Sequence, residues 1–481
     1  MFLVQLGALA LWKSDHSTPQ DDSEFWLDAL RLLTQDFSQD EPWVLTNNNW
    51  KKPAFLQPPD PDCNQWENNF TPKPKGWSKV NTPDEIDMIV TSKNHDLKRA
   101  VAFVNRPEDW IFALVTLQTG EGYGGSKNYG IVRMNGAYSS RPLLGLVPTE
   151  SNSISVNSSL WWQRDMHQLL SWRQESKIID ENNTHALLWC LPWKENEQLD
   201  FRRLDPWFIE VCRRIRLVEI DGRIIGFQGS SKKSRIDSKD LKGYTGDPWA
   251  PVQKKEGKNF TLGGKDFDYG TIVKLLFSGE WKVPYLATRG KNENGDMILI
   301  AEAFSRTNKT EGFKSRLVPI PKETIPFLSP ETSMAEIAEE QMKEIKIFSV
   351  ILRDSLLYMA AGGNKNVFWN KDEKNKLRTK YKKFLALPCK HFEFTVDRHF
   401  FNYLWLRHKG KLVSEKEESK VRLDFLKKLQ KSVQKEFEGA LPTIPCQTIL
   451  KTRATTRARG YFNWELWRNY PELFAKENPS E

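Results

Sequence analysis

A helical pattern begins at Met334-Ala-Glu-Ile-Ala-Glu-Glu-Gln-Met-Lys-Glu-Ile-Lys-Ile-Phe348, where apolar side chains recur at helical spacing. Thr332 and Ser333 precede this stretch, and their hydroxyl groups can accept hydrogen bonds from the first amide groups of a helix. Further helical segments are predicted at 374–385, at 396–408 with 419–437, and at 448–466. Such segments pack naturally as an α-helical bundle of about four helices.

The sequence before Pro330 has a mixed character. An amphipathic core helix is predicted over 4–12 and a second helix over 23–33, after which Pro and Asn accumulate as in a surface loop as far as residue 74. Alternating β-branched residues predict strands over 215–227 and 272–304. This part of the chain therefore combines helices with strands.

The length of the chain predicts two domains. With 481 residues it exceeds the size at which a single hydrophobic core stops growing. A proline-rich linker over 319–330 separates the two regions. We expect an α+β fold in which a large mixed α/β N-terminal globular domain, residues 1–328, precedes a C-terminal four-helix bundle, residues 329–481.

Charge and cysteine content restrict the function. Lys and Arg number 71 against 62 Asp and Glu, a net charge of +9 that suits a polyanionic partner, although many basic proteins bind no nucleic acid. The 5 cysteines contain no CxxC pair, so we expect no disulfide framework and a reducing cytoplasm. Because no apolar run approaches the roughly 18 residues of a membrane span, we expect a cytoplasmic protein with no membrane partner.

The sequence contains no recognised catalytic motif. The 7 histidines and 5 cysteines form no HxxxH, HExxH or paired CxxC arrangement, so no metal or other cofactor is predicted. The sequence also lacks a GxSxG motif and the acidic cluster of a two-metal nuclease. We expect a protein that is not an enzyme. The alternatives are a stand-alone nucleic-acid-processing enzyme with an unrecognised active site and a scaffold that contacts only protein.

The sharpest local motif is Thr119-Gly-Glu-Gly-Tyr-Gly-Gly-Ser126. Its glycines lack side chains and can adopt positive φ, so this backbone can approach a ligand closely. The motif is neither a Walker loop nor a dinucleotide fingerprint. An ordinary glycine-rich turn between strands is the alternative. We refer to Gly122–Gly125 as the glycine loop.

Several motifs in order and spacing resemble the CasA-type large subunit of the type I-E CRISPR Cascade complex. They are Ala102–Pro107, Gly122–Gly125, Asn128–Asn135, Ser140–Pro142, Leu262–Asp268, Lys309–Phe313, Arg316–Pro321 and the helical C-terminal third. The resemblance implies a non-catalytic subunit that recognises the protospacer-adjacent motif in duplex DNA from the minor groove and helps start strand separation and R-loop formation. The implied partners are the guide RNA 5′ handle, double-stranded target DNA, the displaced strand, other Cascade subunits and a trans-acting helicase-nuclease.

The resemblance assigns roles to residues of the N-terminal domain. The glycine loop, which is Gly122, Tyr123, Gly124 and Gly125, would read the motif. Phe103 and Asn105 would contact the RNA handle or a neighbouring subunit, and for Phe103 burial in a strand core is the alternative. A DNA wedge falls on Asn308, Lys309 and Thr310, where some relatives have glutamines and where a hairpin connector is the alternative. A minor-groove lysine falls on Lys239 or Lys242, before Trp249-Ala-Pro251, with a solvated loop as the alternative.

In the helical domain the resemblance assigns guidance of the displaced strand to Lys451, Arg453, Arg457 and Arg459, and the alternative is a solvated basic helix. Relatives commonly carry a further N-terminal segment ahead of the helix that corresponds to 4–12. The contacts of that segment are therefore not assumed for this sequence.

Overall fold

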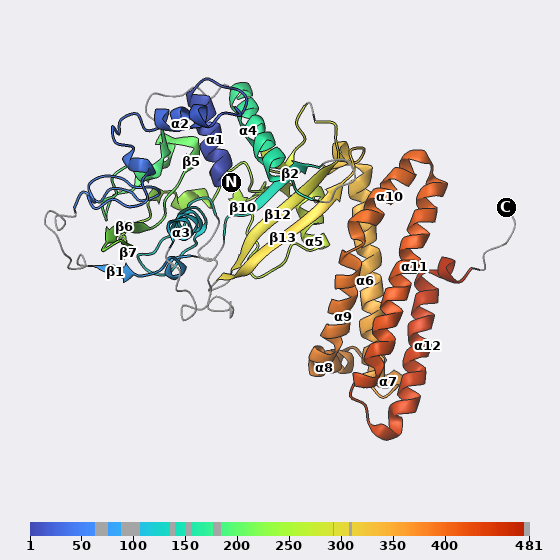
Figure 1. Ribbon diagram of the computed structural model, residues 1–481. Helices are drawn as coiled ribbons and strands as arrows, with labels where there is room; N and C mark the ends of the chain where they lie inside the picture. Colours follow the sequence, from blue (N-terminus) through green and yellow to red (C-terminus); the bar gives the residue numbers. More distant parts are fainter. Residues whose placement is uncertain are drawn as a thin grey trace. The chain divides into compact units, whose positions relative to one another are not determined.

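The computed structural model describes residues 1–62, 76–87, 106–134, 140–149, 155–176, 184–291, 293–306 and 310–475. The chain forms two compact units. The first comprises Met1–Phe267 and Glu280–Lys322, and the second comprises Asp268–Gly279 and Glu323–Glu481. The predicted fold class is confirmed, because the first unit mixes helices with small sheets and the second consists of packed helices (Figure 1).

The first unit contains four longer helices in its described part. They are α1 (Phe2–Lys13), α2 (Ser23–Leu32), α3 (Pro107–Gly120) and α4 (Ser158–Glu175). Its strands are β1 (Trp77–Val80), β2 (Leu143–Pro148), β3 (His185–Leu187), β4 (Leu199–Asp200), β5 (Leu204–Ile209), β6 (Arg214–Ile220), β7 (Arg223–Gly229), β8 (Ile236–Asp237), β9 (Val252–Gln253), β10 (Lys258–Asn259), β11 (Trp281–Lys282), β12 (Met297–Arg306) and β13 (Thr310–Ile320).

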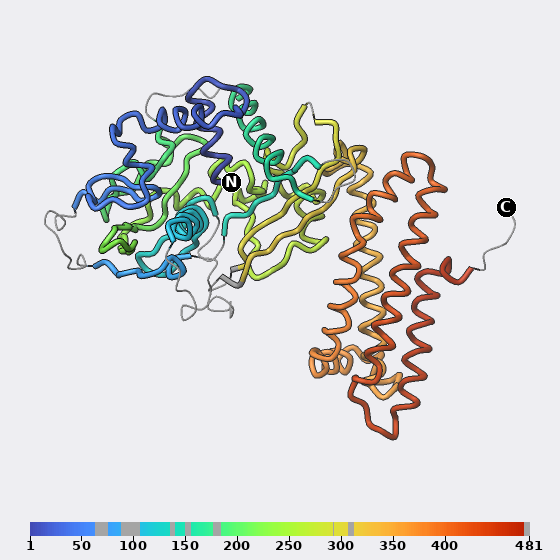
Figure 2. The backbone as a smooth tube through the Cα atoms, in the orientation of Figure 1, coloured from blue at the N-terminus to red at the C-terminus, as the bar shows by residue number. Residues whose placement is uncertain are grey.

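Helix α1 confirms the predicted core helix but is not amphipathic. Every residue from Val4 to Leu11 is buried, so the helix is covered on all sides. Its polar residue Gln5 is satisfied internally, since the side-chain amide donates to the carbonyl oxygens of Trp207 at 3.0 Å and Phe208 at 2.9 Å. These bonds join α1 to β5, which runs beside it in Figure 2.

The sheets of the first unit are small. Strands β13, β12 and β2 form one antiparallel sheet, and β1, β7 and β6 form another. Strands β10, β9 and β11 form a third, while β3 pairs with β5 and β4 with β8 in parallel. The β6–β7 hairpin confirms the strands predicted over 215–227. It turns at Asp221 and Gly222, both with positive φ, as a two-residue hairpin loop requires.

The strand prediction over 272–304 is wrong in its first part. Residues Tyr269–Phe277 form helix α5, which belongs to the second unit, and among the described residues of this range only β11 and β12 are strands. The Asp268 side chain caps α5 by accepting a hydrogen bond from the Thr271 amide at 2.7 Å. Because the apolar residues of α5 are buried, tertiary packing overrides the β propensity of Ile272 and Val273.

The surface loop predicted after residue 33 is irregular, as expected. The prediction is wrong in placing all of it at the surface, because part of it is buried. Trp50, Ala54, Leu56 and Gln57 are at most 1% exposed. Gln57 satisfies buried backbone, because its Oε1 accepts from the Leu217 amide at 2.6 Å. Residues 63–75 of this stretch lie outside the described residues.

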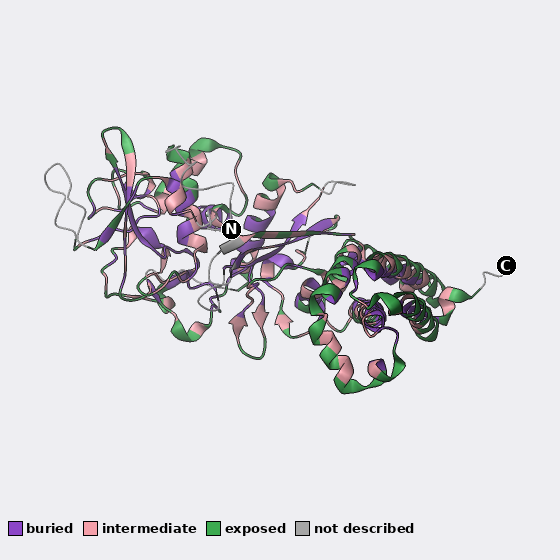
Figure 3. Ribbon diagram, turned by 90° about the horizontal axis from the view of Figure 1, so that it is seen from below, coloured by how far each residue is buried: buried purple, intermediate pink, exposed green. Residues whose placement is uncertain are grey.

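In the described residues, the second unit contains α5 and seven further helices (Figure 1). They are α6 (Ser333–Ala360), α7 (Lys365–Trp369), α8 (Lys371–Lys380), α9 (Lys382–Asp397), α10 (Phe400–Val413), α11 (Glu415–Ala440) and α12 (Lys451–Asn469). Helix α6 packs against α9, α10, α11 and α12. Figure 3 shows buried residues on the inner sides of these helices. The Thr332 hydroxyl accepts from the Ala335 amide at 3.3 Å, which confirms the helix start inferred from the sequence.

Candidate nucleic-acid interface

The base of the glycine loop is fixed by Gln118, a fully buried residue near the end of α3. Its Oε1 accepts hydrogen bonds from the amides of Cys212 at 2.9 Å and Arg213 at 2.8 Å. Its Nε2 donates to the carbonyl oxygens of Leu56 at 2.9 Å and Arg213 at 3.0 Å. One side chain therefore satisfies four buried backbone groups and holds the loop against the connector between β5 and β6.

The glycine loop forms a tight turn rather than part of a helix or strand. The Gly124 amide donates to the Asn128 carbonyl at 2.8 Å, and the Asn128 amide donates to the Gly125 carbonyl at 3.0 Å. Gly125 has φ +111° and Lys127 has φ +69°. Gly124 is exposed at the tip. The loop follows α3 directly, so it does not lie between two strands as the alternative interpretation expected.

Two residues that the sequence did not single out support this turn. A Cβ atom on Gly130 would lie 2.5 Å from the Gly122 carbonyl carbon and 2.7 Å from the Tyr123 amide nitrogen, so only glycine fits there. The buried Arg213 guanidinium donates to the Gly122 carbonyl at 2.6 Å. The loop is thus held from beneath while its tip faces outward. The one sequence signal for this role of Gly130 is its place in the Asn128–Asn135 motif.

A basic segment lies against the glycine loop. The Ser231 amide donates to the Lys127 carbonyl at 2.9 Å, and the Tyr129 hydroxyl donates to the Lys232 carbonyl at 3.1 Å. We call residues 230–243 the lysine segment. Its four lysines are Lys232, Lys233, Lys239 and Lys242, and all of them are exposed. Residues about 100 positions apart in the sequence therefore form one basic surface.

A cavity of about 370 Å³, which we call the glycine-loop cavity, is lined by Tyr123 of the glycine loop, by the chain that follows the loop, by the connector between β5 and β6 and by the lysine segment. Its lining includes two tyrosines, one glutamate and three basic residues, namely Tyr123, Tyr129, Glu210, Arg235, Lys239 and Lys242. The rings of Tyr123 and Tyr129 lie 6.1 Å apart, inclined at 55°. Both lysine candidates predicted from the sequence thus lie on the same cavity as the glycine loop.

Glu210 is the single acidic residue among the described lining residues. It is 5% exposed, and its Oε1 accepts a hydrogen bond from the Val132 amide at 2.7 Å. Its Oε2 has no hydrogen-bond partner among the residues that the structure describes. Burial raises the pKa of the Glu210 carboxyl to about 7, although the charge of Arg133 opposes this shift. No sequence motif marks this residue.

Buried cations surround the cavity. Arg235 lines it and donates to the carbonyl oxygens of Pro192 and Leu191, each at 2.9 Å. Burial lowers the pKa of Arg235 to about 9, although the charge of Glu197 opposes this shift. Burial likewise lowers the pKa of Arg133, which stacks on the Phe208 ring at 3.8 Å, to about 10. The surroundings of the cavity are therefore predominantly positive.

The chain beyond the lysine segment is anchored by a buried ion pair. Asp247 accepts from the Arg141 side chain at 2.6 and 3.0 Å, and Arg141 also donates to the Gln5 Oε1 at 3.1 Å. Two residues later, the Trp249 indole donates to Asp165 at 3.3 Å. These contacts link the two sequence motifs. Arg141 of Ser140–Pro142 holds Asp247, which stands two residues before Trp249-Ala-Pro251.

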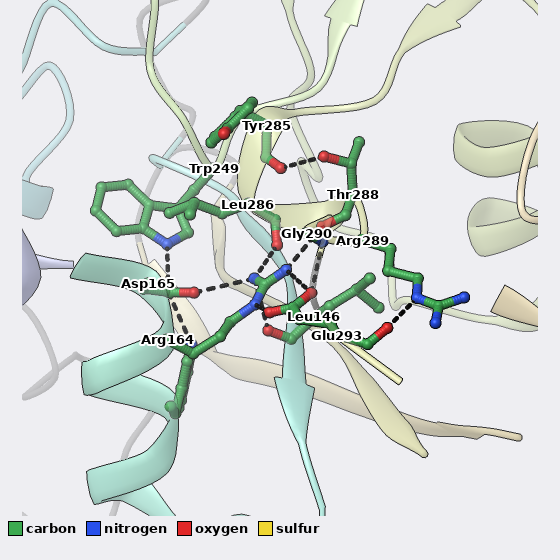
Figure 4. Close-up of polar contacts among 11 residues, drawn as sticks. Leu146, Arg164, Asp165, Trp249, Tyr285, Leu286, Thr288, Arg289, Gly290 and Glu293 are labelled. Atoms are coloured by element: carbon green, nitrogen blue, oxygen red, sulfur yellow. Dashed lines mark hydrogen bonds and ion pairs between the residues drawn. The ribbon is translucent and has the colours of Figure 1, made fainter. Parts of the chain in front are cut away.

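Arg164 fixes the neighbouring strand and loop (Figure 4). Its guanidinium donates to the carbonyl oxygens of Leu146 on β2 at 2.9 Å and of Leu286 at 2.6 Å, and it forms an ion pair with Glu293 at 2.6 Å. The adjacent Asp165 accepts from the Trp249 indole in the same network. Helix α4 therefore acts as the rigid support for the anchor of the lysine segment.

Four of the residues assigned by resemblance lie outside the described residues: Phe103, Asn105, Asn308 and Lys309. Thr310 begins β13, and the hairpin that β13 forms with β12 runs from Arg306 paired with Thr310 to Met297 paired with Ile320.

The basic residues of α12, in the second unit, already have internal partners. Arg457 donates to the Gly363 carbonyl at 2.8 Å and Arg453 to the Gly362 carbonyl at 3.4 Å, so both contact the C-terminal turn of α6. Arg459 pairs with Glu438 at 2.6 Å. Lys451 is exposed. Arg453, Arg457 and Arg459 remain at the surface, where a phosphate can also reach them.

The described residues contain neither a metal-binding cluster nor a helix that could span a membrane. Over these ranges, no group of three or more His, Cys, Asp or Glu side chains is arranged to hold a metal ion. No helix in the same ranges combines the length and apolar character of a membrane span.

Comparisons with known proteins identify the fold. No family model matches the sequence, and no curated protein matches it. The CRISPR-associated protein Cse1 from Acidimicrobium ferrooxidans has a similar structure over 98% of this chain and 90% of its own, with a TM-score of 0.57 and 12% identity. CasA (Cse1) from Thermus thermophilus matches over 97% of this chain and 88% of its own, with a TM-score of 0.55 and 14% identity. The chain therefore has the Cse1/CasA fold over almost its whole length.

Proposed function

We propose that this protein is the non-catalytic large subunit of an RNA-guided surveillance complex of the type I-E Cascade kind. In this function it recognises the protospacer-adjacent motif in duplex DNA from the minor groove. It then helps to start strand separation and R-loop formation, and it docks the effector nuclease. The reducing cytoplasm is the compartment in which such a complex would act.

One observation carries this proposal beyond the likeness in fold. The exposed glycine turn and the four lysines of the lysine segment form a single basic surface, although nothing in the sequence order brings them together. Exposed lysines can contact phosphates on both sides of a groove, while a glycine backbone can approach the base edges between them. The minor groove mainly distinguishes A·T from G·C pairs, so tolerance of several motifs is expected.

The remaining residues extend this proposal over the complex. Phe103 and Asn105 contact the guide RNA 5′ handle or a neighbouring subunit, and Asn308, Lys309 and Thr310 separate the strands beyond the motif. The basic residues of α12, Lys451, Arg453, Arg457 and Arg459, guide the displaced strand. Phosphate contacts of this kind position a strand without reading its sequence.

Co-purification tests the subunit assignment. The tagged full chain, expressed with the other genes of its locus, is expected to elute with a guide RNA and several protein subunits. Elution of the chain by itself, together with metal-dependent DNA cleavage by the pure protein, would establish the alternative of a stand-alone nucleic-acid enzyme.

Salt-dependent binding tests the DNA surface. In the assembled complex, Lys239→Ala with Lys242→Ala is expected to lower affinity for target duplex. The slope of log K against log salt should also become shallower by about 0.9 for each phosphate that the variant no longer neutralises. The matched control is Lys51→Ala with Lys322→Ala, which removes two exposed lysines of the first unit that do not line the glycine-loop cavity. Equal reductions in both double variants would contradict the assignment.

A further inference from the structure

We infer that the glycine-loop cavity receives one unstacked nucleotide of the bound target DNA, and that Glu210 selects a base carrying an exocyclic amino group. This inference rests on the proposed function, because it needs target DNA at the glycine loop. It adds a base-specific pocket to a surface that would otherwise contact only the groove and the phosphates.

The size and walls of the cavity suit a single base. A volume of about 370 Å³ lies within the range of small-ligand pockets. Tyr123 of the glycine loop and Tyr129, four residues after the loop, both line it, and their rings offer faces on which a planar base can stack. Because Gly130 lets the backbone of Gly122 and Tyr123 approach so closely, Tyr123 is held at the boundary between the turn and the cavity.

The charges around the cavity match the two ends of a nucleotide, with lysines for the phosphate and a carboxylate for the donors of the base. Lys239 and Lys242 are exposed where they line it, as contacts to a phosphate require. Arg235 adds a buried positive charge, whose hydrogen bonds go to backbone carbonyl oxygens. The carboxylate of Glu210, in contrast, is 5% exposed. A ligand that is anionic at its outer end and carries hydrogen-bond donors at its inner end matches this arrangement.

Glu210 supplies the selectivity. One carboxylate oxygen accepts from the Val132 amide, and the other has no partner in the described part of the chain. A buried acceptor without a partner is costly, so a ligand that donates to it gains the most. The exocyclic amino groups of cytosine, adenine and guanine donate hydrogen bonds, whereas thymine presents a carbonyl oxygen at the position of the cytosine amino group.

The experiment uses the full chain and DNA duplexes that each carry one bulged nucleotide, because an unpaired base leaves the stack at little cost. Affinity is measured by fluorescence anisotropy for bulged cytosine, thymine and an abasic residue in otherwise identical duplexes. Cytosine and thymine are similar in size, so they compare an exocyclic amino group with a carbonyl oxygen at the same ring position. The assay is run at pH 8, where Glu210, whose pKa is about 7, is ionised. We expect cytosine to bind at least roughly tenfold more tightly than thymine, since a hydrogen bond to a charged group is worth about 1.5–3 kcal/mol.

The Glu210→Gln variant gives a sharper test, because it should reverse the base preference and not merely weaken binding. The Val132 amide requires the oxygen of the new side chain, so the Gln amino group takes the place of the carboxylate oxygen without a partner. The variant is therefore expected to prefer thymine over cytosine. Glu219→Gln, the same change at an exposed position on β6, keeps the wild-type preference. A merely structural role of Glu210 would weaken all duplexes equally.

The outcomes separate this inference from the proposed function. Salt-dependent binding of all three duplexes with equal affinity would overturn the pocket and leave the DNA surface intact. The absence of salt-dependent binding, even in the assembled complex, would overturn the proposed function. A cytosine preference that appears only with bulged RNA would assign the pocket to the guide and refute its assignment to target DNA. If Glu210→Gln loses its far-UV circular dichroism spectrum, the three wild-type duplexes still decide the question.

Discussion

Replacing Glu210 by Gln should make the stability of the first unit less dependent on pH. In the folded protein, burial raises the pKa of this carboxyl to about 7, from 4.5 in an unperturbed glutamate. A raised pKa means that the folded state binds the proton more tightly than the unfolded state does. The stabilising contribution is therefore complete below the unfolded pKa and is lost as the pH rises through the folded pKa.

The magnitude follows from the two pKa values. Between pH 5 and pH 8 the wild-type protein should lose about 2–3 kcal/mol of unfolding free energy through this group. Gln does not titrate, so the variant does not show this loss. At pH 5 the variant is expected to be less stable than the wild type, because its amino group occupies a buried site without a partner, at a cost of roughly 1–3 kcal/mol. The difference in unfolding free energy between the wild type and the variant should then narrow or reverse by pH 8.

Urea unfolding at pH 5, 6, 7 and 8, followed by circular dichroism and tryptophan fluorescence, measures this difference. Other titrating groups, such as Asp165, whose pKa burial raises to about 6, are present in both proteins and cancel. Glu219→Gln serves as the control, since this exposed glutamate should leave the pH profile unchanged. A constant free-energy difference between wild type and Glu210→Gln from pH 5 to pH 8 would refute the reasoning, because it would show that Glu210 does not titrate in this range.

Further predictions concern the loop and α12. Gly130→Ala should reduce binding of target duplex by the complex, because its Cβ would overlap the backbone of the glycine loop. Gly125→Ala has no protein atom within 4 Å of the new Cβ, so it should cost roughly 1–2 kcal/mol of stability through its positive φ on urea unfolding and also weaken duplex binding, and wild-type binding by this variant would argue against close approach of the glycine backbone. Gln118→Leu should destabilise the first unit by at least about 3 kcal/mol in the same assay, since it strands buried backbone groups. Arg453→Ala with Arg457→Ala should reduce the salt slope of target binding equally for matched and mismatched motifs; a changed motif preference with an unchanged slope would argue against strand guidance.

The helical region could be predicted from the sequence because its signals are local. Apolar spacing and the capping threonine at 332 are visible within a few residues, and the structure forms α6 there. The strand predicted over 272–277 was wrong because the structure of this segment depends on distant contacts and not on local signals. Its β-branched residues favour a strand locally, yet burial of all its apolar residues in a helix is more favourable, and only the tertiary structure decides between the two.

The candidate site shows the same division. The glycine loop was evident from its composition, and the lysines were evident as a charged run. Their proximity was not predictable, because it depends on hydrogen bonds between Lys127 and Ser231 and between Tyr129 and Lys232, which are about 100 residues apart. Gln118 and Arg213 were invisible in the same way, since each matters only through backbone groups of a distant segment.

Glu210 shows why the electrostatics of the site could not be predicted from the sequence. In the sequence it is one of 62 acidic residues in a chain of net charge +9, and nothing distinguishes it. The fold buries it in the connector between β5 and β6, gives one oxygen a backbone donor and leaves the other without a partner in the described residues. A surface built only to contact phosphates has no use for a carboxylate, because it repels them. Its position on the cavity below the lysines therefore argues for a ligand that also carries hydrogen-bond donors, and among the parts of DNA only the bases supply them.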